Sequence, residues 1–430
     1  MATAITHQSR DYLENSEETE SPILDETGQD VSDIYLPVFN NIKRNLPAFS
    51  TDILRYFEMR SWTHLNYPWL FNEDRTNWGY YDHDPVMGFG IPERNPLFQW
   101  CIQHHEHWRA DYTFASHFFP EHKYTLLQRL DQGRCYSTLG LEGDGGRMVN
   151  TGIIFTNASD NPDGPARKIL YISFRETTGF VEGLVWNFLS WERAEQYPGN
   201  HYLYRYVGNR DWTPGVNVLG GLWYGAYCSN DKTNQTDSIR RQLLQFTQRN
   251  DISKYKKIII TGKSLGGVLA QYTALDLCIR TEPGMIKLVL FASPRGGGDR
   301  FVQVLNDRKV QCIRMEFDEL DDVIGFPSAV RLFSIRWRHV GIPIRMHVAK
   351  EDMVTDLSQS VIAPSVTRGY QFYLGRDLIY RLLPTKLYYG SLSLWNTHNR
   401  ANYFKWIFSF FVKLNKIKSP ACGFNWESIN

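Results

Sequence analysis

The sharpest chemical signal in the sequence is a serine set between two glycines, in the stretch Gly262-Lys-Ser-Leu-Gly266. The spacing fits G-x-S-x-G, the pattern of a nucleophile elbow, in which a tight turn lifts a serine hydroxyl above the edge of a sheet. Such a hydroxyl attacks a carbonyl carbon once a histidine takes its proton. The competing interpretation is a serine that only caps a helix in a glycine-rich turn. The pattern therefore predicts acyl-transfer chemistry at Ser264.

The residues on both sides of this serine supply the elements that an elbow needs. Isoleucines 258–260 predict a buried strand before the turn, and residues 264–280 predict a helix after it. Gly262 and Gly266 are both required, because side chains at these two positions would collide with each other or with a neighbouring strand. The first N–H groups of the helix point toward the place where an oxyanion would form.

After about Tyr124, short apolar runs alternate with helical patterns. The strand-like runs are residues 152–155, 169–174, 258–261, 286–291 and 312–317, and a further helical pattern covers residues 237–250. Strands that alternate with helices indicate a mainly parallel sheet with helices on both faces. The predicted fold class is therefore α/β.

The chain divides into four predicted segments. Residues 1–30 are acidic and polar and are predicted to be a disordered tail, since they offer little apolar surface to bury. Residues 31–120 are predicted to be an aromatic-rich, mostly helical N-terminal extension, in which residues 52–59 carry an apolar helical face. The α/β domain is expected at residues 121–415, and a C-terminal tail at residues 416–430.

Composition narrows the function classes. The chain has 430 residues, with 47 basic and 46 acidic side chains and a formal net charge of +1. This balance argues against nucleic acid as a partner, because phosphate binding needs a basic surface. The sequence has no apolar segment typical of a signal peptide and no run of the roughly 18 apolar residues that a membrane-spanning helix needs. We therefore expect a cytoplasmic protein or a peripheral membrane protein.

Five motifs in a fixed order resemble those of the class 3 lipases, a family of the α/β-hydrolase superfamily. The elbow resembles G-H-S-L-G-G-x-L-A, and the other four are residues 172–177 (F-R-G-T), 218–227 (V-H-x-G-F-x-x-x-Y), 290–298 (F-G-x-P-R-x-G) and 319–324 (D-x-V). The resemblance covers about residues 124–410. It implies an α/β-hydrolase fold and hydrolysis of carboxylic esters of lipids, of the lipase or phospholipase type. It also implies a lipid or acyl-ester substrate at a membrane or lipid-droplet surface, with no cofactor and no metal.

The same resemblance, together with the superfamily's chain order of Ser, Asp and His, implies the rest of the triad. Asp322 matches the acidic residue of the D-x-V loop after an apolar strand. His398 matches the histidine of a late H-x-x-x-x-Y loop. Ser264, Asp322 and His398 are therefore the expected catalytic residues. The alternatives are Asp318 and Asp321 for the acid, and His339 and His347 for the base.

The oxyanion hole is implied at two backbone N–H groups. Leu265 follows the nucleophile and supplies one of them. Thr177 in the F-R-G-T motif supplies the other, with Thr178 as the alternative if the motif slips by one residue.

Two residues near this site depart from the family pattern. Lys263 replaces the histidine before the nucleophile, and its side chain is expected to point away from the hydroxyl. Glu176 replaces the glycine of F-R-G-T. A carboxylate there opposes a developing negative charge unless Arg175 or another cation neutralises it. Glu176 therefore keeps open an alternative, a catalytically weak or inactive lipase-like interaction or signalling protein.

Three further stretches carry alternatives. Residues 180–206 are rich in aromatic side chains and fall where the family has a lid over its active site. The alternative is that these side chains pack in the core. Residues 404–414 are a terminal helix docked on the sheet, or a segment that dips into a membrane surface. Residues 101–107 hold one cysteine and three histidines, for which a histidine-rich helix without metal is favoured over a zinc site.

Overall fold

An eight-stranded sheet forms the centre of the protein. The computed structural model describes residues 22–63, 109–132, 149–157, 169–176, 194–196, 216–219, 222–223, 227, 238–317, 324, 337–346, 403, 407–408, 410–411 and 414–415. The strands run in the order β1 (Thr113–Ala115), β2 (Lys123–Gln132), β3 (Val149–Asn157), β4 (Ile169–Phe174), β7 (Lys257–Lys263), β8 (Ile286–Phe291), β10 (Gln311–Phe317) and β12 (Ile342–Met346). The first four pair antiparallel, and β4 to β12 pair parallel. The predicted α/β class with a mainly parallel sheet is confirmed.

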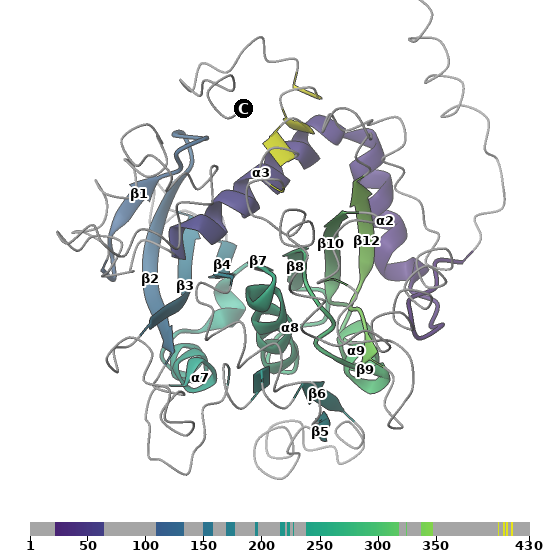
Figure 1. Ribbon diagram of the computed structural model, residues 1–430. Helices are drawn as coiled ribbons and strands as arrows, with labels where there is room; N and C mark the ends of the chain where they lie inside the picture. The colour runs from purple at the N-terminus through teal and green to yellow at the C-terminus, as the bar shows by residue number, and fades with distance from the viewer. Residues whose placement is uncertain are drawn as a thin grey trace, which may run out of the picture.

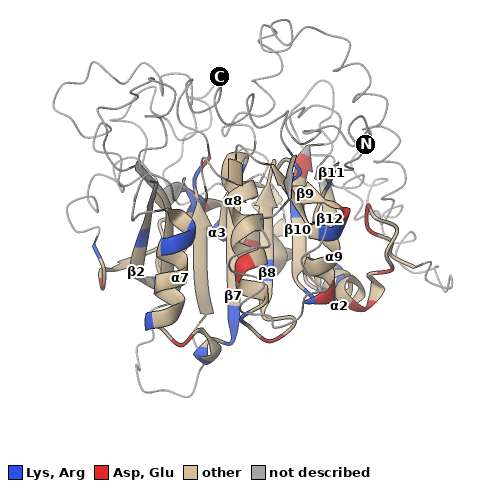
Figure 2. Cartoon of the chain, turned by 90° about the horizontal axis from the view of Figure 1, so that it is seen from below, with Lys and Arg blue, Asp and Glu red and all other residues tan. Residues whose placement is uncertain are grey.

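Helices cover both faces of this sheet. Helix α3 (Leu46–Trp62) lies on one face, above the sheet in Figure 1. Helices α7 (Ile239–Arg249), α8 (Leu265–Cys278) and α9 (Asp299–Asp307) lie on the other face, in front of the sheet in Figure 2. Helix α2 (Ser32–Arg44) packs beside β12. The parallel strands are therefore buried on both sides, which explains their continuous apolar runs.

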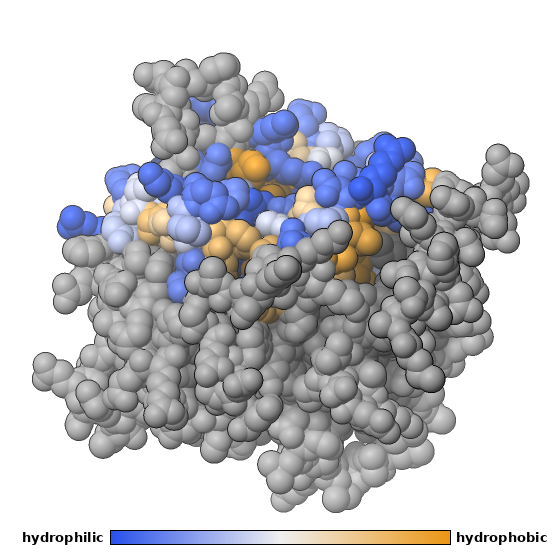
Figure 3. Space-filling model, turned by 90° about the horizontal axis from the view of Figure 1, so that it is seen from above, coloured by the Kyte–Doolittle hydropathy of each residue, from blue (hydrophilic) through white to orange (hydrophobic). Residues whose placement is uncertain are grey.

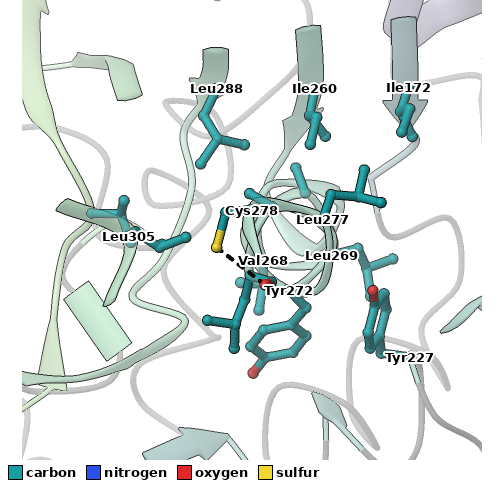
Figure 4. Close-up of a cluster of buried hydrophobic side chains, with 14 of the residues drawn as sticks. Ile172, Tyr227, Ile260, Val268, Leu269, Tyr272, Leu277, Cys278, Leu288 and Leu305 are labelled. Carbon is teal, nitrogen blue, oxygen red and sulfur yellow. Dashed lines mark hydrogen bonds between the residues drawn. The ribbon is translucent and has the colours of Figure 1, made fainter. Parts of the chain in front are cut away.

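Strand β7 contributes apolar side chains to both faces of the sheet. Ile258 and Ile260 belong to the apolar cluster around α8, and Ile259 belongs to the cluster around α3. This division follows because successive side chains of a strand point to opposite faces. In Figure 4, Ile260 and its counterparts Ile172 and Leu288 on the neighbouring strands point toward α8.

Helix α3 brings the N-terminal extension into the core. The apolar face predicted at residues 52–59 is buried, with Ile53, Leu54 and Phe57 at most 1% exposed. At the end of the helix, the ring of Trp62 lies 4.9 Å from that of Phe114, centroid to centroid. Figure 3 views the protein from the side of α3, where hydrophilic residues cover most of the described surface and hydrophobic ones show between them. The buried apolar face of α3 makes this helix a packing layer of the fold.

Smaller elements complete the described structure. A second sheet has the order β11 (Trp337–Arg338), β9 (Gly297–Gly298), β6 (Asn217–Leu219) and β5 (Ala194–Gln196), and a short 3₁₀ helix covers Ile252–Lys254. Ile407 and Phe408 are helical and buried in the cluster around α3, as expected for a docked terminal helix. Among the described residues, the helices are too short or too polar to cross a bilayer.

The segment before α2 also contacts the α/β region. The Asp25 carboxylate accepts a hydrogen bond from Asn306 Nδ2 (2.7 Å), and the Glu26 carboxylate accepts one from the backbone N–H of His339 (3.0 Å). The four segment boundaries predicted from the sequence stay predictions.

Glu58 is a buried carboxyl group on α3. Its carboxylate oxygens accept hydrogen bonds from Ser116 Oγ (2.5 Å) and from the backbone N–H of His117 (2.6 Å). Burial raises the pKa of Glu58 to about 7 from its ordinary value of 4.5, although these hydrogen bonds act in the opposite direction. Folding therefore binds a proton at this residue between these two pH values.

This proton makes the stability of the fold depend on pH. Because the folded-state pKa is raised, the stabilisation is full below about pH 4.5 and is lost as the pH rises through about 7. The loss is about 3 kcal/mol of unfolding free energy. The variant Glu58→Gln cannot ionise, so we expect urea unfolding to show a smaller decrease in its stability over this pH range. Parallel pH profiles for wild type and Glu58→Gln would contradict this assignment.

Candidate active site

Ser264 lies at the junction between β7 and α8, in an unusual backbone conformation. Its φ is 54° and its ψ is −123°, a combination that residues with a side chain seldom adopt. The Ser264 N–H donates to the carbonyl oxygen of Phe291 (3.0 Å), and the Ser264 carbonyl accepts from the Gly267 N–H (2.9 Å). The strand, the neighbouring strand and the helix therefore together hold a sharp turn at this residue, as an elbow requires.

The serine does not act as a helix cap. Ser264 occupies the N-cap position of α8, but its side chain makes no capping hydrogen bond. By contrast, the Ser238 side chain at the start of α7 accepts a hydrogen bond from the backbone N–H of Arg241 (3.1 Å). The capping interpretation of Ser264 is therefore wrong. Ser264 also keeps 8% of its surface exposed, whereas Lys263 and Leu265 on either side keep 2%.

The glycines of the motif allow close backbone approach. A β-carbon on Gly262 would overlap the carbonyl group of Gly266, and one on Gly266 would overlap the carbonyl group of Arg175 at the end of β4. The collisions predicted from the sequence are confirmed. The first turn of α8 therefore lies directly against the segment that leads to Thr177.

Replacing Gly266 with alanine is expected to disrupt the elbow. The added methyl group meets backbone atoms of Arg175, which cannot rotate away, so we expect a loss of about 3 kcal/mol in stability. Hydrolysis is expected to fall with it. The matched control is Gly284→Ala, whose φ is +81° but whose β-carbon would meet nothing within 4 Å. It should cost only about 1–2 kcal/mol and leave the activity of the folded protein intact. Thermal unfolding and ester hydrolysis measure both; wild-type stability in Gly266→Ala would contradict the packing.

The turn after β8 is hydrogen-bonded to α8 through Gln271. Gln271 Nε2 donates to Ser293 Oγ (2.9 Å) and to the Pro294 carbonyl (3.0 Å), while Gln271 Oε1 accepts from the Gly296 N–H (3.1 Å). A β-carbon on Gly267 would overlap Ser293. The residues that resemble F-G-x-P-R-x-G are therefore fixed against the helix that begins at the elbow.

Glu176 is held between two cations. Lys263 Nζ lies 2.6 Å from Glu176 Oε2, and Arg60 Nη1 lies 3.1 Å from Glu176 Oε1. All three side chains are at most 7% exposed. Arg175 instead donates from Nη1 to the backbone carbonyl of Glu176 (2.7 Å). The neutralising cations are thus Lys263 and Arg60.

This cluster was not predicted from the sequence. Lys263 and Glu176 are two departures from the family pattern with complementary charges, and that complementarity was the available signal. The contribution of Arg60 on α3 carried no local signal.

The remaining predicted site residues lie outside the described part of the chain. They are Thr177, Asp322 and His398, and the alternatives Thr178, Asp318, Asp321 and His347 lie outside it as well. His339 is described and fully buried. The stretches at residues 101–107 and 404–406 and nearly all of 180–206 also lie outside. In the residues that the structure does describe, no group of three or more His, Cys, Asp or Glu side chains is arranged to hold a metal ion.

Two features of the described residues concern parts of the chain that lie next to the other predicted site residues in the sequence. Strands β4, β7 and β10 run parallel, so the segments that follow them begin at the same edge of the sheet. Tyr403, which follows His398 by five residues, is fully buried, and Lys263 Nζ lies 5.5 Å from the centroid of its ring. Tyr403 therefore contacts the residue that precedes Ser264.

The strand order, the helices on both faces and the elbow define an α/β-hydrolase fold. Residues 195–325, which include Ser264, match the family model described as lipase (class 3). The resemblance predicted from the motifs is confirmed over this part of the chain.

Comparison with solved structures returned fungal lipases. The lipase of Rhizopus microsporus var. chinensis is 20% identical, with a TM-score of 0.31, and the match covers 45% of this chain and 56% of that one. The native Rhizomucor miehei lipase–propeptide complex is 18% identical, with a TM-score of 0.34, and coverages of 56% and 65%. Lipase II of Rhizopus niveus is 17% identical, with a TM-score of 0.29, and coverages of 46% and 62%. The chain thus spans 56–65% of the length of these lipases. Comparison with curated proteins gave no match.

Proposed function

We propose that this protein is a serine hydrolase that cleaves carboxylic ester bonds of lipids through an acyl-enzyme. The observation that carries the proposal is the backbone of Ser264, which is held at a strand-to-helix turn with φ 54° within the segment that matches the class 3 lipases. Strain of this kind persists only where the surrounding structure imposes it, and it concentrates at active sites.

In the proposed reaction, Ser264 Oγ attacks the acyl carbonyl while His398 accepts the serine proton. Asp322 orients the imidazole and stabilises its cation. The backbone N–H groups of Leu265 and Thr177 hold the negative charge of the tetrahedral intermediate. His398 then gives its proton to the leaving alcohol, and a water molecule activated by the same histidine releases the acyl group. Apart from the substrate and the water molecule, every group in these proposed steps belongs to the protein itself.

Two observations support the choice of His398 and Asp322. Lys263 Nζ lies 5.5 Å from the centroid of the Tyr403 ring, and five extended residues span at most about 18 Å, so the chain length allows His398 to lie beside Ser264. Strand β10 ends at Phe317, at the same edge of the sheet as the end of β7. Asp322 lies five residues beyond this strand end in the sequence, which is where the acid of such a triad is needed.

The charge of Glu176 does not oppose catalysis. A single carboxylate beside the oxyanion hole would disfavour the reaction, but Glu176 has two cationic partners within 3.1 Å. The cluster of Arg60, Glu176 and Lys263 carries one net positive charge, which does not disfavour an oxyanion. This observation favours the enzyme over a lipase-like interaction protein.

The proposed substrate is a lipid ester presented at a surface, with the protein in the cytoplasm or bound peripherally to a membrane or lipid droplet. A panel of triacylglycerol, phospholipid, monoacylglycerol and short soluble esters, offered to wild type and to Ser264→Ala, tests the proposal. We expect wild type to hydrolyse at least one lipid ester and the variant to hydrolyse none. A folded wild-type protein that cleaves no ester in the panel would point to the interaction protein instead.

A further inference from the structure

We propose that Arg60, Glu176 and Lys263 form a positioning cluster that fixes the two oxyanion donors relative to each other, and that the N-terminal extension is part of the catalytic unit through Arg60. This inference rests on the proposed function. It adds a role for three residues that the triad itself does not use.

The cluster lies where two neighbouring strands of the sheet end. The last paired residues of β4 and β7 are Phe174 and Gly262. Beyond this pair, the contact between the two strands passes to side chains, with Lys263 Nζ and Glu176 Oε2 separated by 2.6 Å. The Lys263–Glu176 pair therefore replaces the backbone ladder at the place where the ladder ends.

Each member of this pair lies close in the sequence to a proposed oxyanion donor. Glu176 immediately precedes Thr177, and Lys263 lies two residues before Leu265. A rotation of either backbone would therefore move one proposed donor relative to the other. Displacements of about 1 Å at such a site can cost about a hundredfold in rate.

Helix α3 anchors the cluster. The guanidinium carbon of Arg60 lies 4.2 Å from the centroid of the Phe57 ring on the same helix. The Phe57 ring in turn packs edge-on against that of Phe291, with centroids 5.1 Å apart. The Phe291 carbonyl accepts the hydrogen bond from the Ser264 N–H. Helix α3 thus reaches the elbow through an ion pair and through an aromatic contact.

The direction in which kcat changes in Glu176→Gln distinguishes a geometric role of the cluster from a purely electrostatic one. Replacing Glu176 with glutamine removes a negative charge and leaves two buried cations. If only the local potential mattered, the added positive character would stabilise the oxyanion and raise kcat. If the cluster sets the geometry, the loss of the shared anion separates Lys263 from Arg60 and lowers kcat.

The test measures kcat, KM and the melting temperature of Glu176→Gln, with Asp276→Asn as matched control. Asp276 is also a buried carboxylate in an ion pair, 2.8 Å from Arg240, but it lies 12 residues along α8 from Ser264, about 18 Å by helix rise. We expect Glu176→Gln to lower kcat about ten- to a hundredfold with little change in KM. Asp276→Asn should lower the melting temperature and leave kcat within about twofold, because it breaks a buried ion pair that is distant from the elbow.

Variants of Lys263 complete the test, and they replace Glu176→Gln if that variant folds poorly. Lys263→Arg keeps the cation and is expected to keep kcat within about threefold, whereas Lys263→Met should lose as much as Glu176→Gln. The double variant Lys263→Met/Glu176→Gln should lose no more than the worse single variant, since both act through one contact.

The outcomes separate this inference from the function on which it rests. Unchanged or raised kcat in folded Glu176→Gln, or losses that multiply in the double variant, would overturn the positioning role and leave the hydrolase intact. A folded wild-type protein without ester hydrolysis would overturn both.

Discussion

Replacing Ser264 with alanine is expected to abolish ester hydrolysis and leave the fold essentially unchanged. The hydroxyl is the proposed nucleophile, and loss of such a nucleophile costs about a millionfold in kcat. The stability should change little because the side chain makes no capping hydrogen bond at the start of α8. Hydrolysis of the preferred ester and thermal unfolding, measured on the same preparation, test both parts.

Ser238 provides the matched control for this experiment. It occupies the same position at the start of α7, but its side chain accepts a hydrogen bond from the backbone N–H of Arg241. Ser238→Ala should therefore lose about 1 kcal/mol of stability and keep its activity. If folded Ser264→Ala retained hydrolysis, Ser264 would not be the nucleophile.

Replacing His398 with alanine is expected to lower kcat at least about ten-thousandfold, because the serine would lose the base that takes its proton. Asp322→Asn should lower kcat by about ten-thousandfold, since the amide would hold the imidazole in the wrong tautomer. Adding either substitution to Ser264→Ala should have little further effect, because the three residues act as one unit. Steady-state kinetics over a range of ester concentrations measures these effects.

The alternatives from the sequence serve as controls for this assignment. His347→Ala and Asp321→Asn remove the same side-chain types from other positions in the chain. Both should keep kcat within about tenfold of wild type. A large loss in either variant, with full activity in its counterpart at His398 or Asp322, would transfer the role to the alternative residue.

The central sheet was predictable because its strands carry strong local signals. Strands β4 and β8 begin and end at the residues where the apolar runs 169–174 and 286–291 begin and end. Helix α3 was predicted only over residues 52–59, whereas it extends over Leu46–Trp62. The flanking residues 46–51 and 60–62 carry no clear periodicity, and packing against the sheet decides the length of the helix.

The site was predictable where the chemistry is local in sequence. The elbow needs a strand, two glycines and a helix in one stretch, so the sequence identifies it directly. The cluster around Glu176 is different, since Lys263 lies 87 residues away from it in the sequence. Arg60 belongs to another segment, the N-terminal extension. Such contacts depend on the folded arrangement of β4, β7 and α3, and no single stretch of sequence contains them.

The most direct measurement of the central claim is covalent labelling of the wild-type protein with a serine-reactive alkyl phosphonate, followed by mass mapping of the modified peptide. The probe reports a serine that is both accessible and activated by a base. We predict one adduct, on the peptide that contains Ser264, and none in Ser264→Ala. A folded wild-type protein that stays unlabelled, or that carries the adduct on another serine, would contradict the account.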